Sequence, residues 1–98
     1  MTRDEAIGRL SEQAEAVKAL GATSLFLYGS LSRDAATAAS DLDIFIDDDT
    51  DSRFNAFDLV GIKLLLEERL NVPVDVTTRD GLHPMLRDSI ERAAIRIF

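Results

Sequence analysis

Two aspartates one residue apart, Asp41 and Asp43, begin an apolar run in the segment DLDIFID, residues 41–47. Residues two apart in a strand point to the same side of the sheet, so their Cβ atoms would lie about 7 Å apart. Asp75 stands in a second alternating segment, VPVDVTT, opposite its apolar face. If the two strands are neighbours, three carboxylates converge on one patch. Oxygen-only clusters of this kind suit magnesium or manganese, hard cations that also bind phosphates.

A glycine and a serine, Gly29 and Ser30, follow a short apolar run that predicts a buried strand. Glycine lets the backbone approach a ligand closely, and the following N–H groups with the Ser30 hydroxyl can hold phosphate oxygens. Arg33 could add charge-assisted contacts to the same phosphates. Carboxylates for a metal and a cradle for phosphate, on one edge of a sheet, indicate metal-assisted phosphoryl or nucleotidyl transfer. The plainer alternatives are a simple turn and a solvated strand face.

The elements that must position these residues follow from the spacing of apolar side chains. Thr2 and Glu5 fit a capping box at the start of an amphipathic helix over residues 3–20. Strands are predicted over residues 23–28, 41–47 and 72–78. Pro73 places the last of these at an edge of the sheet or at a strand start. Tyr28 ends the first strand as a partly buried core residue, with stacking on a base as the alternative.

Two further helices are predicted after the second strand. The first has a cap at Asp51 or Ser52, an end at Asn71, and a wide apolar face that should lie well buried. That face comprises Phe57, Leu59, Val60, Ile62, Leu64, Leu66 and Leu70. As a crossover between two strands, this helix would usually make them parallel. The last helix begins near Pro84, and its apolar stripe (Leu86, Ile90, Ala93 and Ile97) continues to the C-terminus.

The length favours one domain over residues 1–98, the order of the predicted helices and strands indicates a small α/β fold, and the absence of cysteine fits a cytoplasmic protein. We expect a mixed three-stranded β-sheet flanked by about four helices. No apolar run approaches the roughly 20 residues that span a bilayer, and the chain has no cysteine for disulfides or thiolate metal sites. The net charge of −7 argues against a nucleic-acid partner and is compatible with metal ions or a basic protein surface.

The segment GSLSRDAATAASDLDIFID, residues 29–47, resembles the signature of the DNA polymerase β-like nucleotidyltransferase superfamily. The small size, the VDV strand and the ending GLHPMLRDSIERAAIRIF are similar to its minimal nucleotidyltransferases. Many of these are antitoxins paired with a HEPN-domain toxin, and some transfer AMP from ATP to a tyrosine of that toxin. The resemblance implies that Asp41 and Asp43 bind two magnesium ions, and that Asp75 completes the metal site and helps deprotonate the attacking hydroxyl.

The same resemblance implies a nucleotide site. Gly29 and Ser30 would hold the triphosphate, Arg33 matches a frequent arginine of the motif, and Ser40 would support the loop before the aspartates. Asp34 departs from the pattern, because the residue after that arginine is often glycine. A carboxylate pointing at a triphosphate would weaken nucleotide binding.

Two other functions stay open at this point. The protein could be an antitoxin that neutralises its partner by binding alone, which Asp34 favours and a retained Asp75 opposes. It could also transfer a nucleotide to RNA or to a small molecule. The lack of basic clusters counts against RNA, and the short chain counts against a dedicated small-molecule pocket.

Overall fold

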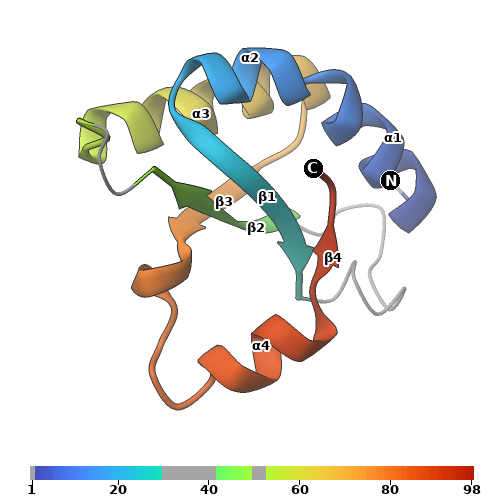
Figure 1. Cartoon of the computed structure of the whole chain (residues 1–98). Coiled ribbons are helices and arrows are strands. Elements are labelled where there is room, and N and C mark those ends of the chain that lie inside the picture. Colours follow the sequence, from blue (N-terminus) through green and yellow to red (C-terminus); the bar gives the residue numbers. More distant parts are fainter. Residues whose placement is uncertain (1, 30–41, 50–52) are drawn as a thin grey trace.

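The chain, seen in a computed structural model, is described over residues 2–29, 42–49 and 53–98. A four-stranded sheet has the order β3-β2-β1-β4. Its strands are β1 (Ala22–Tyr28), β2 (Leu42–Asp48), β3 (Val74–Thr78) and β4 (Ile95–Arg96). Helices α1 (Arg3–Glu12), α2 (Ala14–Ala19) and α3 (Ala56–Leu70) lie on one side of the sheet, and α4 (Arg87–Ala93) lies on the other (Figure 1). Within these ranges no helix is long and apolar enough to cross a membrane.

The strand pairing confirms the predicted mixed sheet and adds one strand to it. β1 runs antiparallel to β2 and β4, whereas β2 and β3 are parallel, as predicted from the helix that connects them. β3 is an edge strand that begins directly after Pro73, which agrees with both positions predicted for this proline.

The core lies between the sheet and the first three helices. Apolar residues from alternate positions of the strands point toward it, as the period of two predicted. Its fully buried members include Leu10, Val17, Leu25, Leu27, Leu42, Ile44, Ile46, Ile62, Leu66, Leu70 and Val74.

The predicted first helix is divided into α1 and α2. The Thr2 hydroxyl accepts a hydrogen bond from the Glu5 N–H at 3.1 Å, which is one of the two bonds of the predicted capping box. Gln13 has φ −95° and ψ 5°, outside the regular helix. Ser11 donates its hydroxyl to the Ile7 carbonyl at 2.7 Å, and such bonds within a helix favour bending.

The cap predicted for α3 was wrong. Asn55, and neither Asp51 nor Ser52, is the N-cap: its side chain accepts from the N–H of Phe57 and Asp58, and the Asp58 carboxylate accepts from the Asn55 N–H. Asp51 and Ser52 themselves lie outside the described residues. At the other end, Asn71 adopts the left-handed conformation with φ 57°, as predicted.

The apolar face of α3 is only partly buried. Ile62, Leu66 and Leu70 contact the core, but Phe57, Val60 and Leu64 are 87%, 50% and 58% exposed. The prediction that the whole apolar face is buried was therefore wrong for Phe57, Val60 and Leu64. A single sheet can cover only one side of a helix, and the opposite side of α3 faces solvent.

The predicted last helix ends early. A 3-10 turn (Arg79–Gly81) leads to α4, which ends at Ala93. Ala94 is extended with φ −69° and ψ 148°, and Ile95 and Arg96 pair with β1. Ile97 therefore belongs to no helix, and its N–H donates to the Leu25 carbonyl at 2.8 Å. The final residues form hydrogen bonds with backbone groups on one edge of β1, which would stay unpaired if the helix continued.

Arg79 connects the sheet with α4, on the face of the sheet opposite α1, α2 and α3. Arg79 forms two hydrogen bonds with the Asp47 carboxylate at 2.8 and 2.9 Å, and lies 3.5 Å from Glu91 of α4. Its guanidinium also stacks over the rings of Phe26 and Phe45, at 4.8 and 5.1 Å from their centroids. These two rings are themselves stacked at 4.7 Å. Arg79 thus covers aromatic surface that the first three helices do not reach.

Replacing Arg79 with alanine is expected to lower the free energy of unfolding by about 1–2 kcal/mol, because it removes a bidentate pair and two cation–π contacts together. Arg79→Lys should recover only part of this, since an ammonium cannot form the bidentate pair. Urea unfolding measures both variants. Arg92→Ala is the control, because its pair with Asp88 is 79% and 78% exposed; an equal loss there would contradict the role given to Arg79.

Candidate active site

Two carboxylates and a phenol form a row across the sheet. Asp43 of β2 is the register partner of Asp75 on β3 and of Tyr28 on β1. Paired residues on neighbouring strands lie about 4.8 Å apart and share one face of the sheet. This face is opposite the core formed with α1 and α3. Asp43 and Asp75, distant in sequence, are therefore brought side by side as predicted.

Gly29 approaches this row from the end of β1. Its φ of 78° lies in the left-handed region, and a Cβ atom built there would collide with Oδ2 of Asp43. Glycine is thus required twice, for the backbone conformation and for the space beside the carboxylate. The backbone at Gly29 therefore lies close to Asp43, and its approach to a phosphate stays a prediction.

The charges of Asp43 and Asp75 affect the pKa of the Tyr28 phenol. Burial raises the pKa of its phenol, and the negative charges of Asp43 and Asp75 raise it further. The side chain is half-buried, and its ring lies 5.7 Å from that of Phe45. This agrees with the predicted partly buried tyrosine. Both carboxylates act on the same phenol, so they create a shared region of negative potential.

The donor set fits a hard divalent cation. Adjacent carboxylates offer oxygen ligands only, which suits magnesium, and a cation between them would relieve their mutual repulsion. Among residues 2–29, 42–49 and 53–98, no three acidic or histidine side chains gather as a complete metal site. Asp41, the remaining predicted ligand, lies outside these ranges, as do Ser30, Arg33, Asp34 and Ser40.

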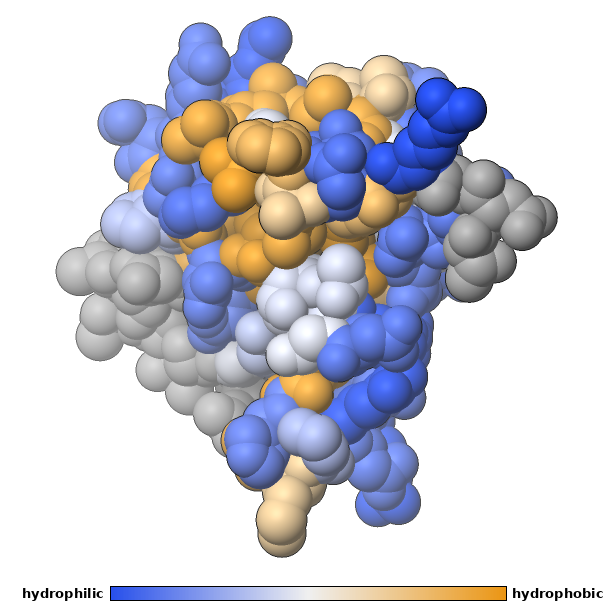
Figure 2. All heavy atoms as spheres, turned by 90° about the vertical axis from the view of Figure 1, so that its left-hand side faces the viewer, coloured by the Kyte–Doolittle hydropathy of each residue, from blue (hydrophilic) through white to orange (hydrophobic). Residues whose placement is uncertain are grey.

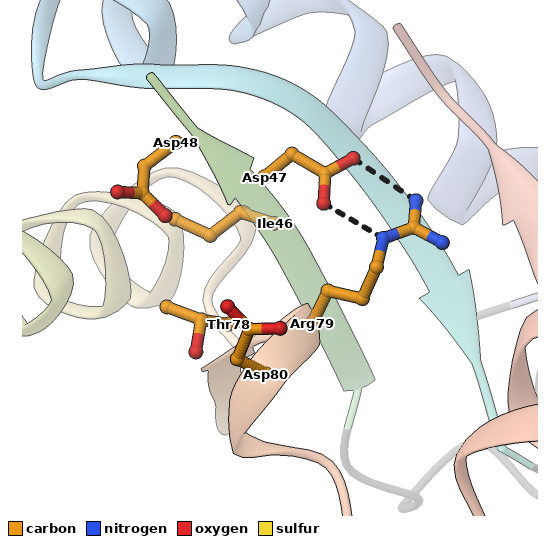
Figure 3. A pocket seen from close by; sticks show the side chains of 6 residues that line it. All are labelled: Ile46, Asp47, Asp48, Thr78, Arg79 and Asp80. Carbon is orange, nitrogen blue, oxygen red and sulfur yellow. Dashed lines mark hydrogen bonds and ion pairs between the residues drawn. The ribbon is translucent and has the colours of Figure 1, made fainter. Parts of the chain in front are cut away.

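A separate hollow of about 220 Å³ lies at the other end of β2 (Figure 3). Its lining comprises Ile46, Asp47, Asp48, Thr78, Arg79 and Asp80. Asp47 points toward Arg79, whereas Asp48 points away from this pair. Sequence reasoning did not predict the Asp47–Arg79 pair. The available signal was the position of Arg79, which continues the alternation of Asp75 and Thr77 one residue beyond β3.

Comparisons with known proteins identify the family. The nucleotidyltransferase domain model matches residues 10–97, and the chain belongs to this family. A Methanocaldococcus jannaschii protein named "putative protein adenylyltransferase" is 35% identical over 71 residues, 72% of this chain and 74% of that protein. A solved "putative minimal nucleotidyltransferase" is 30% identical with a TM-score of 0.82, covering 97% of this chain and 95% of that one.

A toxin–antitoxin structure with AMP-PNP has the same fold. Its TM-score is 0.71 at 14% identity, with 90% of this chain and 72% of that chain covered. Together with the family match, the fold and the Asp43–Asp75 row define a nucleotidyltransferase of the minimal type.

The phenol of Tyr28 gives a direct test of the row, because the chain has one tyrosine and no tryptophan. Titration by ultraviolet absorbance should give a pKa above the ordinary value of about 10. In Asp43→Asn it should fall toward that value but stay above it, since burial remains the main cause. A pKa raised by folding stabilises the protein below pH 10, and this stabilisation is lost as the pH rises through the folded-state pKa. An unchanged pKa in Asp43→Asn would contradict the shared field.

Proposed function

We propose that this nucleotidyltransferase is an antitoxin that transfers AMP from ATP to a tyrosine hydroxyl of a cognate HEPN-domain toxin, in the cytoplasm. The observation that carries the proposal is the register pairing of Asp43 with Asp75, beside the close approach of Gly29. The relative named as a protein adenylyltransferase supports a protein acceptor. The shared fold of a toxin–antitoxin structure with AMP-PNP supports a toxin partner and an adenine nucleotide.

Each site residue has a role in this proposal. Asp41, Asp43 and Asp75 hold two magnesium ions, and Gly29 and Ser30 bind the triphosphate. Arg33 contacts phosphate oxygens, and Ser40 supports the loop before Asp41. Bound magnesium would neutralise charge on the phosphates and on the attacking and leaving oxygens.

The reaction is an in-line displacement at phosphorus. The acceptor hydroxyl oxygen forms a bond to the α-phosphorus of ATP, and the bond from that phosphorus to the bridging oxygen breaks. Pyrophosphate leaves with the bonding electron pair. The hydroxyl proton passes to the Asp75 carboxylate, which is exposed at the edge strand and so accessible to an acceptor.

The edge position of β3 also suits a large acceptor. Asp75 lies on the outermost strand of the sheet, so a protein can approach it without passing other strands. The net charge of −7 would attract a basic partner and accelerate encounter. A macromolecule that brings its own hydroxyl group needs no additional substrate domain in this chain.

Neutralisation by binding alone is the second candidate, and Asp34 is the observation that favours it. The placement of Asp75 counts against it, because a site with no activity does not require a second carboxylate in register with Asp43.

Intact-mass spectrometry of the partner toxin tests the proposal. Toxin, this protein, ATP and magnesium should give mass gains of about 329 Da, one AMP unit for each transfer with loss of pyrophosphate. Asp43→Asn should abolish the gain. Asp48→Asn, on the same strand but in the separate hollow, should preserve it. A tight complex with no mass gain would favour neutralisation by binding, and AMP found on RNA in place of protein would reject the proposed acceptor.

A further inference from the structure

Two charged residues of α3, Lys63 and Glu67, reach the outermost strand of the sheet. They are four residues apart on the helix and form an ion pair at 3.1 Å, with 43% and 30% of their side chains exposed. We call them the α3 pair. Figure 2 shows apolar side chains gathered in one patch, at the height of α3, with charged side chains around it. An exposed ion pair on a helix ordinarily contributes little to stability, so the contacts of the α3 pair with β3 decide what it does.

Both backbone groups of Val74 are bound by the α3 pair. The Lys63 ammonium donates to the Val74 carbonyl at 2.7 Å, and the Val74 N–H donates to Oε2 of Glu67 at 3.1 Å. Lys63 also donates to this Oε2 atom, so the three residues form a closed ring of hydrogen bonds. The Val74 N–H and the Lys63 ammonium lower the pKa of Glu67, which keeps its carboxylate charged at neutral pH.

The bound groups are those that an edge strand leaves open. Leu42 of β2 donates its N–H to the Pro73 carbonyl at 3.1 Å, and Leu42 is the register partner of Val74. In a parallel ladder, alternate residues bond to the neighbouring strand, so Asp75 bonds to β2 while Val74 faces outward. At this residue the α3 pair thus provides the donor and the acceptor that a fifth strand would provide.

We propose that Lys63 and Glu67 are positioning residues for Asp75, and that they hold its carboxylate in the row with Asp43. The carbonyl that Lys63 binds belongs to the peptide group that joins Val74 to Asp75. Within the described sheet, β3 has a neighbouring strand on one side only. Segments with few such contacts open locally at low cost, and the α3 pair opposes this opening from the other side. The inference rests on the proposed function of Asp75 in nucleotidyl transfer.

Substitutions at Glu67 distinguish positioning from an effect of charge. Glu67→Ala removes the acceptor of the Val74 N–H and should lower the single-turnover rate of transfer about tenfold, because a displaced catalytic group slows the chemical step. Glu67→Gln keeps an oxygen that can accept both hydrogen bonds, so its rate should stay within about threefold of wild type. An equal loss of rate in both variants would overturn the proposal, since charge alone would then explain it.

Coupling to Asp75 separates positioning from general stability. In an Asp75→Asn background, Glu67→Ala should cause no further loss of rate, because the carboxylate that it positions is already absent. The loss of stability to urea should be the same in both backgrounds. A tenfold loss of rate in both backgrounds would contradict the inference. Asp88→Ala is the matched control: it removes another ion pair between residues four apart on a helix, that with Arg92 at 2.7 Å, and should keep the wild-type rate.

Amide hydrogen exchange, measured by NMR on the free protein, tests the inference without toxin or ATP. The Asp75 N–H should exchange about tenfold faster in Glu67→Ala than in wild type. It should exchange at the wild-type rate in Glu67→Gln. The N–H of Leu27, on the central strand β1, should change less than that of Asp75.

The exchange result stands apart from the proposed function. An unchanged rate at Asp75, or an equal increase at Leu27, would overturn the positioning inference even where transfer is normal. If wild type transfers no AMP to the toxin, the proposed function fails, whereas faster local exchange at Asp75 still supports the hold of the α3 pair on this residue.

Discussion

Asp43→Asn is expected to lower the rate of nucleotidyl transfer by at least about 10³-fold, because in the proposed mechanism it removes a carboxylate charge that would hold the metal near the transition state. Asparagine keeps the shape of the side chain and removes repulsion with Asp75, its register partner. The variant should therefore fold at least as stably as the wild type. Single-turnover transfer from radiolabelled ATP measures the rate, and urea unfolding measures the stability.

Asp75→Asn should give a similar loss by the same assay. Asp80→Asn is its control, because Asp80 lies soon after β3 but its side chain is 92% exposed and lies 3.4 Å from the Arg87 guanidinium. Rates within tenfold of wild type for Asp43→Asn would show that this carboxylate does not hold the metal.

In wild type, magnesium should change the fluorescence of Tyr28, and this change should be lost in Asp43→Asn.

Gly29→Ala is expected to reduce transfer about 10²-fold while the protein remains folded. The new Cβ would collide with Oδ2 of Asp43, and a catalytic group displaced by about 1 Å can cost this much. A φ of 78° also disfavours alanine. Steady-state and single-turnover transfer, with circular dichroism as a check on folding, measure the effect.

Gly21→Ala is the matched control for this variant. Gly21 also has a positive φ, 114°, and a Cβ there would meet the Phe54 ring at 2.8 Å, at the opposite end of β1. The control should lose stability but keep its rate per folded molecule. Equal losses of rate in the two variants would show that strain in β1, and not displacement of Asp43, explains the result.

The sequence predicted the part of the site that depends on strand period and crossover. Alternation placed Asp43 and Asp75 opposite the apolar faces of their strands, and the helix between the strands predicted that they are parallel. Register could not be read from either pattern, because it depends on how α3 and the strands pack together. The geometry around Asp41 and Ser30 stays a prediction, since both lie outside the described residues.

The errors had physical causes that a one-dimensional pattern does not reveal. The spacing of Ile90, Ala93 and Ile97 favoured a continuous helix, but the alternation of Ile95, Arg96 and Ile97 also fits a strand. The open edge of β1 favours the strand. For α3, apolar spacing does not distinguish a side that contacts the sheet from a side that faces solvent, and Phe57 lies on the second.

The crossover through α3 also determines when the enzyme can first act during its synthesis. Gly29 and Asp43 emerge from the ribosome before α3, and Asp75 emerges after it. β2 and β3 can pair in register only when the helix between them has docked, and such non-local pairing is a late step in folding. A nascent or truncated chain that lacks β3 would carry the first half of the site without the second. In the proposed mechanism, nucleotidyl transfer therefore begins only when the sheet is complete, which would make transfer activity a measure of finished folding.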